Sequence, residues 1–96
     1  MFPRLRELKR FFAALTSASR LRIIEQLARA GAEVSVGELA DRLRMSQPLV
    51  SWHLRGLRRA SLVQIRRAGR QAFCSLNREQ LAHYQRLFTE LLEETK

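Results

Sequence analysis

Residues 35–60 read SVGELADRLRMSQPLVSWHLRGLRRA, and this stretch decides the fold. It holds two serines, Ser35 and Ser46, that stand where helices are expected to begin, because a serine side chain can accept a hydrogen bond from a free amide of the first turn. The spacing predicts a short helix over residues 36–43, a tight connection, and a longer helix over residues 47–60. Two short helices joined by so short a turn are typical of a helix-turn-helix.

The apolar residues of these two helices recur at helical spacing and predict the face that each turns toward the core. Glu38 stands three residues after Ser35, so we expect a capping box in which the glutamate reaches back to the serine amide. Pro48 suits the first turn of the longer helix, where its missing N–H costs nothing. The expected core residues are Leu39, Ala40 and Leu43 on the first helix, and Val50, Leu54 and Leu57 on the second.

Two further helices are expected on the N-terminal side, over residues 2–15 and 19–30. Gly31 stands where a left-handed residue commonly ends a helix. The apolar stripe of the second of these helices is predicted to comprise Leu21, Ile24, Leu27 and Ala28.

On the C-terminal side, residues 62–67 and 71–76 are rich in β-formers and flank a turn that contains Gly69, which predicts a β-hairpin. Asn77 is then expected to cap a last helix. The predicted fold is a single domain, residues 1–96, mainly α with a β-hairpin wing. It is a winged helix-turn-helix in the order α-α-α-α-β-β-α.

Charge is distributed unevenly along the chain. The 18 basic and nine acidic residues give a net charge of +9. No acidic residue occurs between Asp41 and Glu79, an interval that holds nine arginines, so the whole net charge lies in this central segment. Such a segment is expected to meet a polyanion, and arginine is suited to phosphate and to guanine. A solvated basic face and an anionic membrane surface are the alternatives.

Four stretches together resemble the ArsR-type winged helix-turn-helix repressors. They are residues 15–27 (LTSASRLRIIEQL), 36–43 (VGELADRL), 45–57 (MSQPLVSWHLRGL) and 62–76, with the hairpin RRAGRQAFCSL. The resemblance implies a homodimeric transcriptional repressor that binds duplex DNA sequence-specifically in the cytoplasm, at an inverted-repeat operator. Its helix from Gln47 would enter the major groove.

The candidate DNA-binding residues lie on the longer helix of the motif and on the hairpin. Gln47 can pair with adenine, and Ser51 can reach a base or a phosphate. Ordinary surface polarity is the alternative for both, and packing on a neighbouring element is the alternative for Trp52. His53 is expected beside the core. The full candidate set is Ser46, Gln47, Pro48, Ser51, Trp52, Arg55, Arg59, Arg66, Arg67 and Arg70.

The first and last helices carry apolar faces that look too wide for one small core, and the resemblance places a dimer interface on them. We therefore expect a homodimer. The expected interface residues are Leu5, Leu8, Phe12, Leu81, Tyr84, Phe88 and Leu91.

The sequence departs from the resembled family at its metal sites. Residues 34–38 hold no thiol, and the last helix offers His83 alone, so we expect no metal and no cofactor. Cys74 is expected to be a buried structural cysteine, with a redox switch as the alternative. No apolar run approaches the roughly 20 residues that span a bilayer, which predicts no membrane partner. No constellation of an enzyme is present.

Two other functions remain open at this point. The same fold could dock a protein partner, with the basic face incidental, or could bind DNA without sequence preference. The sequence does not name an operator or an effector.

Overall fold

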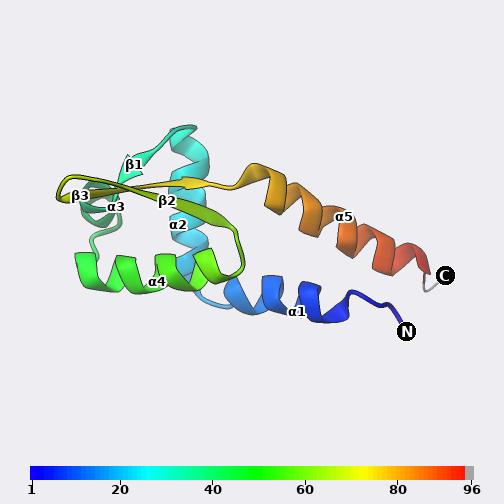
Figure 1. The fold of residues 1–96 in the computed structure, drawn as a ribbon. Coiled ribbons are helices and arrows are strands. Elements are labelled where there is room, and N and C mark those ends of the chain that lie inside the picture. Colours follow the sequence, from blue (N-terminus) through cyan, green and yellow to red (C-terminus); the bar gives the residue numbers. More distant parts are fainter. Residues whose placement is uncertain (95–96) are drawn as a thin grey trace.

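The computed structural model describes residues 1–94, so residues 95–96 of the expected domain lie outside the described part. Within that part, the chain forms five helices and a small three-stranded antiparallel sheet (Figure 1). This order confirms the predicted winged helix-turn-helix. The elements are α1 (Leu5–Ala14), α2 (Ala18–Ala30), β1 (Val34–Ser35), α3 (Val36–Leu43), α4 (Gln47–Arg59), β2 (Val63–Ala68), β3 (Gln71–Leu76) and α5 (Arg78–Glu94).

The sheet has the strand order β1-β3-β2. Strands β2 and β3 form the predicted hairpin, called the wing below, in which Ala68 pairs with Gln71 and Gly69 takes a φ of 61° at the turn. Strand β1 was not predicted, because two residues are too few to show a pattern. It forms because Val34 and Ser35 pair with β3 in the folded chain.

The predicted helix caps are largely confirmed. The Ser35 and Ser46 hydroxyls accept hydrogen bonds from amides three residues on, at 3.1 and 3.3 Å, and Asn77 caps α5 in the same way at 3.2 Å. Gly31 ends α2 with a φ of 66°. The second half of the capping box is wrong: the Glu38 carboxylate accepts from the guanidinium of Arg42 at 2.6 Å, one turn further along the helix.

The helix-turn-helix encloses the core as expected at α3 and α4, where the six predicted apolar residues are all buried. The prediction for α2 is partly wrong. Ile23 and Leu27 are its buried residues, whereas Leu21 is 50% exposed and Ala28 is also exposed. A stripe centred on Leu21 and one centred on Ile23 fit the same apolar spacing, and the placement of α3 and α4 selects the second.

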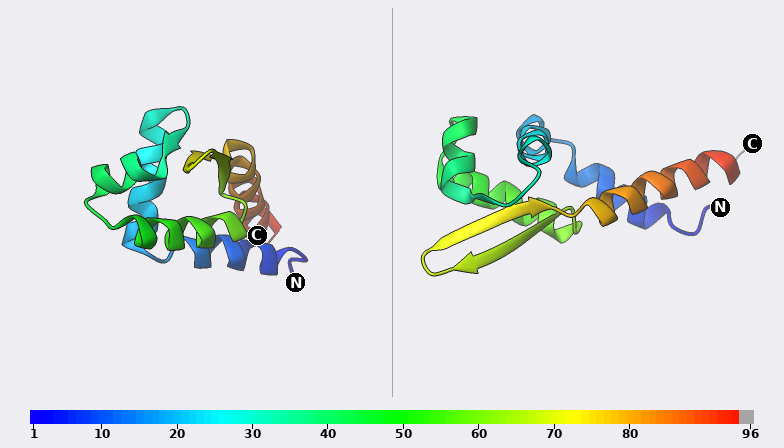
Figure 2. Two further views of the ribbon diagram at one scale, coloured as in Figure 1. Left: turned by 60° about the vertical axis from the view of Figure 1, so that its left-hand side comes forward. Right: turned by 90° about the horizontal axis from the view of Figure 1, so that it is seen from above.

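Helices α1 and α5 extend side by side from the body and carry both termini at one end of an elongated molecule of 49 × 21 × 20 Å (Figures 1 and 2). The rings of Phe11 and Tyr84 stack between them with centroids 4.5 Å apart. The Tyr84 hydroxyl donates to the Ala60 carbonyl at 3.0 Å, which ties α5 to the end of α4. Helix α1 begins at Leu5, three residues later than predicted.

Candidate nucleic-acid interface

Helix α4 presents its N-terminal half to the wing. Ser46 caps the helix and Pro48 lies in its first turn, so the chain enters it with Gln47 exposed and Ser51 half-buried. On the other side of the helix, Val50 and Leu54 are buried in the core. The part of the exposed side that faces the wing therefore carries polar groups, whereas Leu49 and Trp52 are exposed elsewhere on the helix.

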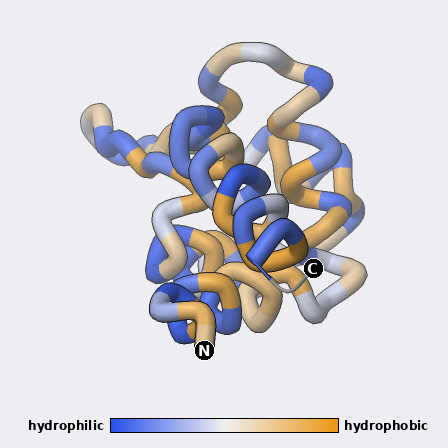
Figure 3. The backbone as a smooth tube through the Cα atoms, turned by 90° about the vertical axis from the view of Figure 1, so that its right-hand side faces the viewer, coloured by the Kyte–Doolittle hydropathy of each residue, from blue (hydrophilic) through white to orange (hydrophobic). Residues whose placement is uncertain are grey.

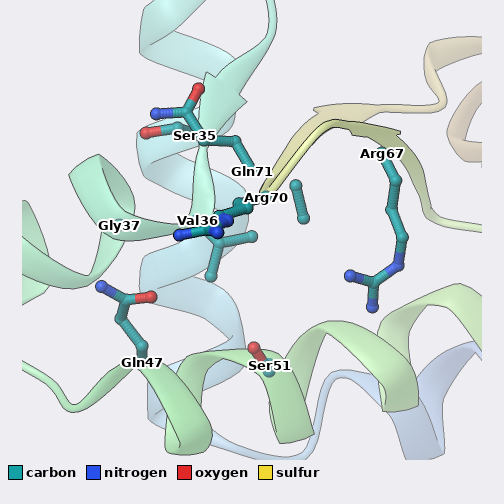
Figure 4. Close-up of a pocket in the computed structure, with 9 residues that line it drawn as sticks. Ser35, Val36, Gly37, Gln47, Ser51, Arg67, Arg70 and Gln71 are labelled. Carbon is teal, nitrogen blue, oxygen red and sulfur yellow. The ribbon is translucent and has the colours of Figure 1, made fainter.

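A pocket of about 290 Å³ lies between α4, the start of α3 and the wing. Gln47 and Ser51 line it from α4, and Arg67 and Arg70 line it from the wing. Figure 4 shows the Arg67 side chain extending from the wing toward α4. The fold thus brings residues from two separate elements of the sequence to one hollow.

A smaller pocket, of about 80 Å³, continues along α4 and shares Ser51 and Arg67 with the first. Arg55 and Arg58 line it. Arg58 was not among the candidate site residues, although its spacing from Gln47 and Ser51 on one helix face could have indicated it. We call the two pockets together the α4–wing groove, defined by Gln47, Ser51, Arg55, Arg58, Arg67 and Arg70.

The α4–wing groove carries one sign of charge. Four of its lining residues are arginines, and none of the described residues that line either pocket is acidic. Field lines concentrate in a hollow lined by one sign of charge, which raises the local concentration of the opposite charge. The groove is therefore suited to an anionic ligand that also offers hydrogen-bonding groups.

Trp52 and Arg59 lie outside this groove. Trp52 is 54% exposed, and its ring packs edge-on against His53 and beneath the Arg20 guanidinium, whose Cζ atom lies 5.3 Å from the ring centroid. His53 is buried beside the core, as predicted. Arg59 is exposed at the C-terminal end of α4.

Arg66 lies on the opposite face of the wing from Arg67. Successive side chains of a strand alternate between faces, so only one of the two neighbouring arginines can face α4. Arg66 instead binds the Glu33 carboxylate and lies over the ring of Phe73. The hydrogen bond from Arg66 lowers the pKa of Glu33, and the same carboxylate raises the pKa of Arg66. The expected DNA contact of Arg66 stays a prediction, although Arg66 does not share the groove-facing side of the wing with Arg67.

The expected dimer residues differ in their exposure. Leu8 and Tyr84 are buried in the core of the chain itself, so they cannot be surface residues of this protomer. Phe12 and Phe88 are 44% and 41% exposed and meet edge to face, with centroids 5.3 Å apart. Figure 3 looks at this end of the molecule and shows hydrophobic residues on both terminal helices. Of the remaining three, Leu5 is exposed and Leu81 and Leu91 are half-buried.

Two further predicted positions are engaged by neighbours. The Cys74 thiol is buried and donates to the Val34 carbonyl at 3.4 Å, and its burial raises its pKa to about 11. Burial of this cysteine is as predicted. His83 hydrogen-bonds to the Glu7 carboxylate on α1, and this bond lowers the pKa of Glu7. Within residues 1–94, no three His, Cys, Asp or Glu side chains gather closely enough to hold a metal ion.

Within the same residues, no helix has the length and apolar character needed to cross a bilayer.

A helix-turn-helix followed by a hairpin that closes a basic groove defines a winged helix-turn-helix of the regulatory class. The family described as "Bacterial regulatory protein, arsR family" matches residues 17–64. This chain belongs to that arsR family, whose members compared below are transcriptional regulators rather than enzymes.

Individual relatives agree with this assignment. The chain is 37% identical over 89 residues to the "Transcriptional repressor SmtB homolog" of Synechocystis sp., covering 93% of this chain and 66% of that one. It is similar in structure to the "ArsR-like Transcriptional Regulator from Rhodococcus sp. RHA1", with a TM-score of 0.82, 30% identity, and coverage of 94% and 83%. It is also similar to the "homodimeric winged helix-turn-helix DNA-binding domain" Mb0332 from Mycobacterium bovis, with a TM-score of 0.73, 27% identity, and coverage of 95% and 82%. The chain thus spans slightly less than two thirds of the curated Synechocystis relative.

Proposed function

We propose that this chain is a homodimeric repressor of transcription that binds a duplex-DNA operator sequence-specifically in the cytoplasm. Residues 1–96 would act as one DNA-binding domain with dimerisation helices at both ends. The observation that carries the proposal is the α4–wing groove, in which arginines and hydrogen-bonding side chains line one hollow without a carboxylate among the described lining residues. Duplex DNA offers both a polyanionic backbone and polar base edges.

The two sides of the groove would divide the recognition. Helix α4 has 13 residues, about 20 Å of helix, and its exposed N-terminal end fits the major groove. Gln47 and Ser51 would contact base edges there, with Ser46, Pro48 and Trp52 around them. Phosphate contacts would fall to the arginines that border the helix and the wing, namely Arg55, Arg58, Arg59, Arg67 and Arg70.

Dimerisation would place two such grooves on one DNA. Phe12 and Phe88 form an exposed aromatic pair on the arm made by α1 and α5, away from the groove. Exposed apolar surface of this kind is commonly an interface, and the Mycobacterium bovis neighbour is described as homodimeric. A two-fold dimer would read an inverted repeat whose half-sites lie about one helical turn apart.

Repression would then follow from occupancy, because a dimer bound across an operator excludes polymerase from it. The Synechocystis relative is described as a transcriptional repressor, which supports this direction of control. We propose no metal effector, since the described residues do not assemble a ligand set.

The test is selection of bound sequences from random duplex DNA, followed by titration of the selected site against salt. We expect an inverted repeat and a strong salt dependence. If each protomer neutralised about three phosphates, the log–log slope would be near −5. Binding of all sequences alike would indicate a non-specific architectural protein, and absence of salt-dependent binding would indicate a protein-docking module.

A further inference from the structure

An ion pair braces the wing on the face that turns away from α4. The Arg66 guanidinium donates from Nε to Oε2 of Glu33 at 3.0 Å and from Nη2 to Oε1 at 2.9 Å. These two bonds form the forked arrangement in which both partners are held in one orientation. The Arg66 Cζ atom lies 4.9 Å from the centroid of the Phe73 ring. We call these three residues the wing brace.

The wing brace spans the whole width of the sheet. Glu33 immediately precedes β1, Phe73 is on the central strand β3, and Arg66 is on β2. Phe73 is the register partner both of Ser35 on β1 and of Arg66 on β2. The pair therefore connects the two outer strands across the ring of the middle one. It joins the body, at β1, to the strand of the hairpin that has no other strand beside it.

The brace acts where the wing is weakly attached to the body through the sheet. Strand β1 is only two residues long, so the ladder that joins the hairpin to the body is short. Arg67, the next residue on β2, faces the other way and lines both pockets of the α4–wing groove. A change in the direction of the hairpin at Arg66 would therefore move Arg67 and Arg70 relative to α4.

We propose that Glu33 and Arg66 are positioning residues, which set the direction of the wing and so the place of Arg67 and Arg70 over the DNA, and that Arg66 is not itself a phosphate ligand. This inference rests on the proposed function. The rival arrangement predicts the opposite effect of removing Glu33 on DNA affinity. In that arrangement Arg66 would contact phosphate, and Glu33 would weaken this contact by neutralising the charge of Arg66.

The test measures operator affinity against salt for Glu33→Gln, Arg66→Gln and the double variant. If the pair positions the wing, both single changes weaken binding, each by about two- to fivefold, the range that an exposed ion pair can contribute. The double variant is then no weaker than either single one, because both remove the same interaction. The salt slope stays close to the wild-type value, because Arg67 and Arg70 still reach phosphate in the complex and only the free energy needed to place the wing has risen.

Two control variants distinguish an effect on the position of the wing from an effect of net charge or of a lost phosphate contact. Glu25→Gln removes one negative charge from another exposed ion pair, on α2, and should leave affinity near the wild-type value. Arg67→Gln should weaken binding and flatten the salt slope by about one unit per lost contact. The thermal unfolding midpoint of each variant shows whether it remains folded.

Four results would overturn the proposal. Tighter binding by Glu33→Gln, or a flatter slope for Arg66→Gln, would make Arg66 a restrained phosphate ligand. Unchanged binding by both would leave the pair without a role. Amide hydrogen exchange in β2 and β3 of free Glu33→Gln should also be faster than in the wild type, and unchanged exchange would count equally against the brace. This last measurement needs no DNA, so it tests the brace even if the wild type fails to bind an operator.

Discussion

The guanidinium of Arg20 on α2 donates a hydrogen bond from Nε to Nδ1 of His53 on α4, over 3.3 Å. A guanidinium has no acceptor, so Nδ1 must carry no proton and the imidazole is held neutral. Arg20 also donates to the Ala14 carbonyl at 3.4 Å and covers the ring of Trp52. One side chain thus joins the end of α1, α2 and α4.

This contact predicts acid sensitivity. Burial, and then the charge of Arg20, lower the pKa of His53 below its usual 6.5. The unfolded chain therefore takes up a proton at a higher pH than the folded chain, and stability falls as the pH drops below about 6.5 until the folded pKa is passed. The slope contributed by this one group is at most about 1.4 kcal/mol per pH unit.

The measurement is urea unfolding between pH 7.5 and 5.0, followed by the fluorescence of Trp52, the single tryptophan of the chain. His53→Asn keeps an oxygen acceptor for Arg20 but cannot titrate, so it should show a smaller loss over this range. Equal losses for the two proteins would show that His53 is not the group responsible.

Gly56 lies against the same arginine. A Cβ atom at this position would come within 2.3 Å of Arg20 Nη2, so Gly56→Ala must displace the guanidinium from its bonds to His53 and Ala14. We expect destabilisation by about 1 kcal/mol, because the lost hydrogen bonds outweigh the helix propensity of alanine. In an Arg20→Ala background the same change should stabilise the protein by up to about 1 kcal/mol. Unfolding free energies of the four proteins test this, and equal signs in both backgrounds would contradict it.

Base-specific contacts and phosphate contacts should come from different sides of the α4–wing groove. Gln47→Ala should relax preference at one position of each half-site, worth about 1–3 kcal/mol there, and leave non-specific affinity nearly intact. Arg67→Ala should weaken binding to every sequence and flatten the salt slope. Competition across single-base operator variants distinguishes them. If both variants behave alike, Gln47 is not a reader.

The exposed aromatic pair should govern assembly. Phe88→Glu places a charge beside Phe12 in the expected interface and should weaken dimerisation by about 2 kcal/mol or more, and most of the DNA affinity with it. Thr89→Glu introduces the same charge 100° around α5 and serves as the control. Sedimentation at micromolar concentration gives the result. A wild type that is a folded monomer there would remove the proposed dimer.

Metal ions should leave operator affinity unchanged. His83 already bonds to Glu7, and the described residues offer no third ligand close to them. Zinc, nickel, cadmium or arsenite at low micromolar concentration should therefore have no effect, in the wild type or in His83→Gln. Tight stoichiometric binding that releases DNA from the wild type alone would show that His83 belongs to a metal site.

Local chemistry made much of the fold predictable from the sequence. The caps at Ser35, Ser46 and Asn77 and the left-handed end at Gly31 depend on residues within one turn, so their identity is enough to place the helix ends. The periodic apolar positions of α4 likewise indicated its buried side.

Only the tertiary structure decided which face of a helix or strand packs against which other element. The apolar spacing of α2 is compatible with a buried stripe centred on Leu21 or on Ile23. The packing of α3 and α4 against α2 buries Ile23 and leaves Leu21 exposed. The charge pattern of the sequence does not distinguish Arg66 from Arg67. In the folded strand, however, neighbouring side chains point to opposite faces, so Arg66 meets Glu33, which lies 33 positions earlier in the chain. Contacts within one turn are fixed by neighbouring residues, whereas the facing of a strand or helix depends on elements that reach it only when the whole chain folds.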